Sequence, residues 1–152
     1  MKHAITIIRN FRSQALQLFD TYSEEQLNQV PEGFNNNILW NLGHLIASDQ
    51  QIWYMASNHP LRIDKPFIDT FRRGTKPEQP YDAATIQQVK NFMIQPIDDF
   101  VADYNTGMFS EYNTWTPLVG GPVTSLDEAI AFSAFHHGLH ASAINRIRKF
   151  IG

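Results

Sequence analysis

The stretch that decides the fold is residues 35–57, which read NNNILWNLGHLIASDQQIWYMAS. Apolar side chains recur in it at the spacing of one helix face. This stripe contains Ile38, Leu42, Leu45, Ile46, Ile52, Trp53 and Ala56, with Asp49 among them. The asparagines at its beginning are good N-cap residues. The pattern therefore predicts an amphipathic helix over residues 35–57, with His44 lying beside the apolar stripe.

Three more stretches show the same helical spacing, over residues 4–21, 81–104 and 125–150. We expect Pro96 to kink the second of them, because proline removes a helix hydrogen bond. The last begins with Ser125-Leu126-Asp127-Glu128, which matches a capping box. Four such helices predict an all-α fold in which residues 1–152 form a single four-helix-bundle domain.

Two long connections separate the last three helices, over residues 58–80 and 105–123. The first is rich in proline, and the second contains Gly120-Gly121-Pro122. A bundle that simply runs up and down needs only short loops. We therefore expect long crossover connections in both places, with short extended pieces at most in the second.

The composition excludes several classes of protein. Hydrophobic residues make up 43% of the chain and charged residues 18%, with a net charge of -3 and no cluster of basic residues. This argues against a nucleic-acid-binding surface. No segment has the apolar length of a membrane span, and the N-terminus does not resemble a signal peptide. We expect a soluble, cytoplasmic protein, with no nucleic acid and no membrane among its partners.

Three histidines are candidates for a metal site. His136 and His140 are four residues apart, so on a helix they share one face, and His44 could complete a three-nitrogen site from another helix. The chain has no cysteine, which leaves imidazole and carboxylate as ligands. The spacing alone leaves alternatives open, because His137 could pair with His140 instead, and His44 could be a hydrogen-bonded core residue.

The position of His44 suggests where a pocket would open. It lies about two turns from the start of its helix, so we expect the opening near Asn37, Trp40 and Asn41, with the 58–80 loop at the rim. Arg72, Arg73 and Lys76 of that loop could add positive charge, although at least two of them are expected to face water.

The chain resembles the DinB/YfiT-like superfamily of metalloenzymes. The likeness rests on Pro31-Glu32-Gly33-Phe34, on Ile38-Leu39-Trp40-Asn41-Leu42-Gly43-His44-Leu45 and on Ala134-Phe135-His136-His137-Gly138-Leu139-His140. It implies a four-helix bundle, a homodimer, and zinc or nickel held by His44, His136 and His140. The family often has glutamate where this chain has His137. It also often has glycine, or glycine-glutamine, two residues after the last histidine, where this chain has Ser142 and Ala143.

The resemblance also implies an enzyme that transfers a low-molecular-weight thiol to an electrophilic small molecule through a metal-bound thiolate. The chain lacks cysteine, so the thiol would come from a cosubstrate. One alternative is a hydrolase that uses metal-bound hydroxide, with His137 or Asp49 relaying protons. Another is a metal-binding bundle without catalytic activity.

Overall fold

The computed structural model describes residues 2–151 and is built from helices. The helices are α1 Lys2–Ala15, α2 Leu18–Thr21, α3 Glu24–Asn28, α4 Ile38–Trp53, the 3-10 helix η1 Met55–Ser57, α5 Lys65–Phe71, α6 Ala83–Asn91, α7 Gln95–Asn105 and α8 Leu126–Ile147. Within this range the chain forms no β-strand, and Trp115 and Val123 make an isolated antiparallel bridge. The all-α prediction is confirmed.

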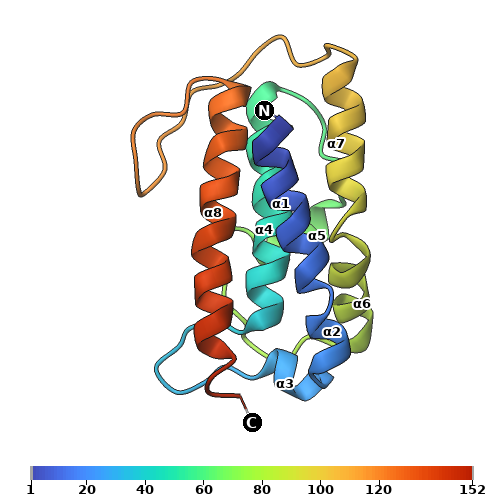
Figure 1. Ribbon diagram of the computed structural model, residues 1–152, viewed down its shortest axis with the longest axis vertical. Coiled ribbons are helices and arrows are strands. Elements are labelled where there is room, and N and C mark those ends of the chain that lie inside the picture. The colour runs from blue at the N-terminus through green and yellow to red at the C-terminus, as the bar shows by residue number, and fades with distance from the viewer. Residues whose placement is uncertain (1, 152) are drawn as a thin grey trace.

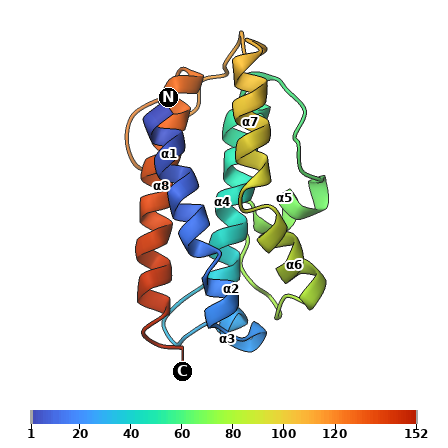
Figure 2. The same cartoon turned by 45° about the vertical axis from the view of Figure 1, so that its right-hand side comes forward.

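Four helical columns form the bundle, as Figures 1 and 2 show from two directions. They are α1 with α2, α4, α6 with α7, and α8. Because α4 and the α6–α7 column run the same way, the chain after α4 must return along the whole bundle, and α5 lies on this return. The later connection crosses the end of the bundle where α7 ends and α8 begins. The predicted bundle with long connections is thus confirmed.

The helices differ from the sequence prediction in several places. The helix predicted over 4–21 is interrupted between α1 and α2, and the one predicted over 81–104 is broken between Asn91 and Gln95. Pro96 does not kink a continuous helix but lies in the first turn of α7, where its missing N–H costs no helix bond. The connection 58–80 also contains an unexpected helix, α5, capped by the Asp64 side chain.

Helix α4 lies at the centre of the molecule. It packs against α8, α5, α6 and α3, and all of its residues except Gln51 and Ile52 are buried. The stripe predicted for a half-exposed helix is therefore only part of its buried surface. Buried polar side chains need hydrogen-bond partners, so the polar residues of α4 are held in defined positions.

None of the helices between residues 2 and 151 has the length and apolar character that crossing a lipid bilayer requires.

Candidate metal centre

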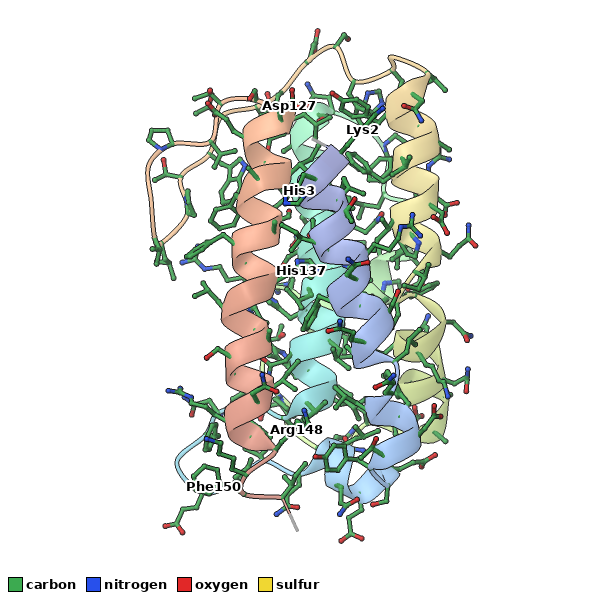
Figure 3. All side chains as sticks on the ribbon, viewed as in Figure 1. Lys2, His3, Asp127, His137, Arg148 and Phe150 are labelled. Carbon is green, nitrogen blue, oxygen red and sulfur yellow. The ribbon has the colours of Figure 1, made fainter. Side chains whose placement is uncertain are left out.

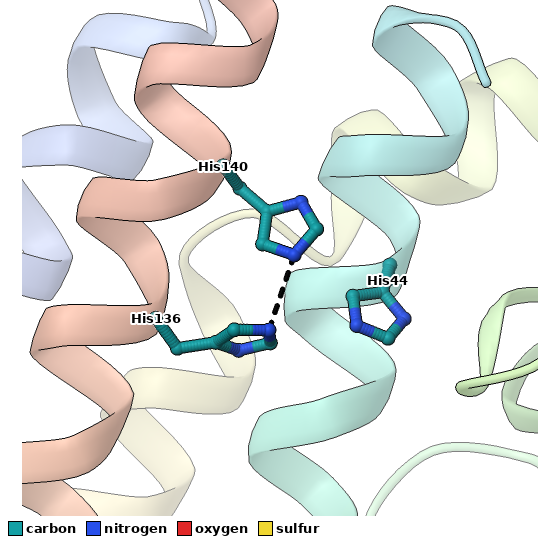
Figure 4. A group of neighbouring side chains, drawn as sticks. All are labelled: His44, His136 and His140. Carbon is teal, nitrogen blue, oxygen red and sulfur yellow. Dashed lines mark hydrogen bonds between the residues drawn. The ribbon is translucent and has the colours of Figure 1, made fainter. Parts of the chain in front are cut away.

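The three predicted ligands converge between α4 and α8. His44 projects from α4 toward His136 and His140 of α8, as Figure 4 shows. One ligand atom from each ring lies within 4.8 Å of the others. His136 and His140 are brought together by their four-residue spacing on one helix, and their Nε2 atoms are 3.1 Å apart.

The ring of His44 is oriented by a backbone carbonyl. Its Nδ1 lies 2.8 Å from the oxygen of Phe71, and because a carbonyl can only accept, Nδ1 carries the proton. The Nε2 lone pair is then directed toward the other histidines, with the Ser48 hydroxyl 3.2 Å away. Trp40 stacks on the ring, with centroids 4.6 Å apart. His44 thus presents Nε2 as its donor atom.

Gly43 explains why Phe71 can approach so closely. A Cβ atom at this position would lie 2.4 Å from the Phe71 ring, far inside van der Waals contact. The missing side chain lets the end of α5 pack directly on α4 beside His44. The glycine before the histidine is therefore part of the site, because it permits the carbonyl contact that orients the ring.

His140 is oriented by a buried amide. Its Nδ1 lies 2.7 Å from Oδ1 of Asn41. The Asn41 amide nitrogen donates to the carbonyl oxygen of Asn37 and to Oδ1 of Asn36, which assigns the other amide atom as the oxygen. His140 Nδ1 therefore donates, and its Nε2 lone pair is directed into the cluster. Such outer hydrogen bonds are typical of metal-binding histidines.

His136 supplies the third imidazole and has the fewest hydrogen bonds. Its Nδ1 is buried without a hydrogen-bond partner among the described residues. Its Nε2 lies 3.1 Å from the His140 Nε2, which lacks a proton and therefore accepts, so His136 Nε2 donates this hydrogen bond. Binding of a metal by His136 Nε2 would need only a shift of its proton to Nδ1, and the Nε2 atoms of three neutral rings would then meet as ligands. This donor set fits a divalent cation, which accepts lone pairs from neutral imidazoles.

The rings are neutral at neutral pH. Burial lowers the pKa of His44. Burial, together with the neighbouring rings, lowers the pKa of His136 to about 4 and that of His140 to about 3. Only a neutral imidazole can bind a metal ion. The cluster is therefore in its metal-binding form without having to lose protons.

A cavity of about 360 Å³ opens beside the histidines. Besides the three rings, it is lined by Ser48, Gln51 and Ile52 of α4, by Phe132, Phe135 and Leu139 of α8, by Arg73, and by Trp115, Pro117, Leu118 and Val119 of the loop before α8. Its size is in the range of small-molecule sites. The two residues of α4 that are not fully buried, Gln51 and Ile52, face this space.

The cavity lies elsewhere than the sequence suggested. Asn37, Trp40 and Asn41 do not line it. Asn37 caps α4, Trp40 stacks on His44, and Asn41 orients His140. The cavity instead lies beside the part of α4 from His44 to Ile52, because residues 115–119 of the 105–123 connection form one of its walls. Of the three loop cations, Arg73 lines the cavity, whereas Arg72 and Lys76 do not.

His137 faces away from the cavity, toward α1 (Figure 3). It is 1% exposed. Its Nδ1 donates to the carbonyl of Ser133, and its Nε2 accepts from Arg12. Asp49 forms a buried ion pair with Arg12 at 2.6 Å. The proton relay considered for His137 and Asp49 requires contact with the cavity, which both residues lack. His137 points away from it because α8 turns about 100° between His136 and the next residue.

Arg12 was missed by the sequence reading although the sequence contains a signal for it. It falls on the stripe of α1 that buries Ile5, Ile8 and Ala15, and a cation on an apolar stripe needs a buried partner. Burial raises the pKa of Asp49 to about 7, although the positive charge of Arg12 acts to lower it. The Phe71 carbonyl and Ser48 left no comparable signal in the sequence.

Comparison with known protein families gives one finding. A sequence model described as the DinB superfamily matches residues 7–144, a range that includes all three histidines. A search of curated proteins found no significant match.

Proposed function

We propose that this chain, which belongs to the DinB superfamily, is a divalent-metal-dependent enzyme whose metal is held by His44, His136 and His140. One observation carries the proposal: three neutral imidazoles converge beside a cavity large enough for a small molecule. Three protein ligands leave coordination positions open, as in catalytic rather than structural sites.

The composition of the cluster also supports a reactive site over a purely structural one. In the described part of the chain, no fourth histidine, aspartate or glutamate joins the three rings. Zinc or nickel suits such a nitrogen donor set. Bound there, a divalent ion would acidify a coordinated thiol or water.

The reaction we propose is the transfer of a low-molecular-weight thiol to an electrophilic small molecule. The chain contains no cysteine, so the thiol must be a cosubstrate. The cavity walls are mainly apolar, and no carboxylate lines them within the described residues. A hydrolase that relies on a carboxylate base would lack that base here, whereas an acidified thiol needs none. The Ser48 hydroxyl, beside His44 Nε2, would donate a hydrogen bond to a group bound at this face.

The proposal is tested with protein purified without an affinity tag and loaded with zinc or nickel. Low-molecular-weight thiols are paired with chromogenic aryl halides and epoxides, and loss of thiol is followed. We expect turnover by the wild type and by the His3→Ala variant, whose change lies on exposed α1 surface. We expect none by His140→Ala. Equal rates in wild type and His140→Ala would contradict the proposed function.

The family likeness is also the support for a homodimer. Sedimentation equilibrium of the metal-loaded protein tests this, and a mass of one chain across the concentration range would contradict it.

A further inference from the structure

The cavity beside the histidines has one arginine on a mainly apolar lining. Its walls include the rings of Phe132, Phe135 and Trp115, and the side chain of Leu139. Among the described residues of the lining, Arg73 is the one arginine or lysine, and no aspartate or glutamate is present. A ligand that fills the space would meet mainly apolar surface and the Arg73 guanidinium.

The side chain of Arg73 has no partner of its own within residues 2–151, since it forms neither a hydrogen bond nor an ion pair there. Its neighbour differs, because Arg72 lies 3.7 Å from the Asp69 carboxylate and does not line the cavity. An unpaired guanidinium at the edge of an apolar cavity is suited to bind an anion, because its planar fork matches a carboxylate in two parallel hydrogen bonds.

The backbone that carries Arg73 is fixed on both sides of the residue. On one side, the carbonyl of Phe71 accepts from His44. On the other, the hydroxyl of Thr75 accepts from the Trp40 indole nitrogen at 3.0 Å. Gly74, with a φ of 90°, forms the turn between them, a conformation that glycine adopts without strain. Since Trp40 stacks on His44, the backbone that carries Arg73 is held in a fixed position relative to the histidine cluster.

We propose that the cavity binds a small molecule with an apolar body and one anionic group, which pairs with Arg73. The apolar body lies against Phe132, Phe135 and Leu139, and the reacting end faces His44, His136 and His140. This assignment of substrate class rests on the proposed function of the site. Arg73 is a binding residue in it, and neither Arg72 nor Lys76 shares the role.

The test compares two probes of the same shape, phenylbutyrate and its uncharged amide phenylbutyramide. Their affinities are measured by calorimetry or by NMR titration, with metal-free and with zinc-loaded protein. We expect phenylbutyrate to bind about fivefold more tightly than the amide in both forms, the effect that solvent-exposed ion pairs reach at most. Arg73→Gln removes this preference and leaves the affinity of the amide unchanged.

Arg72→Gln is the matched control, because it removes an equal charge from the neighbouring residue, which lies outside the cavity. We expect this variant to keep the preference for phenylbutyrate. A preference for phenylbutyrate that survives in Arg73→Gln would overturn the proposal. A preference that appears only in the zinc-loaded protein would also overturn it, because the carboxylate would then be binding the metal. Failure of both probes to bind at millimolar concentration also contradicts it. Zinc stoichiometry is measured on the same samples, so a failed metal site is distinguished from a failed anion site.

Discussion

The amide oxygen of Asn41 on α4 accepts a hydrogen bond from Nδ1 of His140 on α8, over 2.7 Å. This contact joins the two helices that carry the three histidines. It also selects the tautomer of His140 in which Nε2 is free to bind a metal ion. Asn41, which the sequence placed at the mouth of the pocket, therefore orients a ligand from outside the histidine cluster.

Replacing Asn41 by Ala removes this support but none of the proposed ligands. We expect zinc affinity to fall about tenfold to a hundredfold, the usual effect of losing an outer hydrogen bond to a ligand, while one ion still binds at saturation. Competition with a chelating dye measures the change. Asn35→Ala, an exposed site nearby, is the control, and equal affinities in the two variants would rule out the orienting role.

Two helix glycines give opposite expectations. Gly43→Ala places a methyl group against the Phe71 ring, so we expect a loss of about 1–3 kcal/mol in the free energy of unfolding, the usual effect of overpacking. Gly138→Ala meets nothing within 4 Å and should stabilise the helix by up to about 1 kcal/mol. Urea denaturation compares them, and the close packing would be refuted if Gly43→Ala were as stable as Gly138→Ala.

The depressed histidine pKa values predict how stability varies with pH. In the unfolded chain these rings bind protons below about pH 6.5, but in the folded chain His136 does so only near 4 and His140 near 3. The folded state binds fewer protons in that interval. The metal-free protein should therefore be most stable above pH 6.5 and lose about 1.4 kcal/mol per pH unit for each ring as pH falls.

Urea denaturation at a series of pH values measures this slope. A double variant, His136→Gln with His140→Gln, removes both titrating rings and should show a flatter profile. A wild-type profile no steeper than that of the double variant would contradict the assigned pKa shifts.

The buried pair of Arg12 and Asp49 predicts an effect on stability separate from the histidine cluster. Asp49→Ala leaves the Arg12 charge buried without its partner and should cost about 3–5 kcal/mol. Arg12→Met combined with Asp49→Leu replaces both charges by apolar groups and should recover most of that loss. Thermal and urea unfolding compare the variants. The pairing would be disproved if the double variant were less stable than Asp49→Ala.

The features that could be predicted from the sequence are those that depend on the spacing of nearby residues. The helical stripes placed four helices, and the spacing of His136 and His140 placed two rings on one face. It did not predict α5, because a seven-residue helix is too short to show a stripe. The cavity was misplaced because one of its walls comes from the 105–123 connection, and the path of a loop depends on tertiary packing rather than local pattern. The Phe71 carbonyl that orients His44 belongs to the backbone and has no sequence signature.

The central claim is that His44, His136 and His140 together hold one divalent ion. Equilibrium dialysis of untagged, chelator-treated protein against zinc, followed by elemental analysis, tests it most directly. We expect one ion per chain in the wild type and in His3→Ala, and no stoichiometric ion in variants with alanine at any one of the three histidines. Full zinc content in all three alanine variants would contradict the claim.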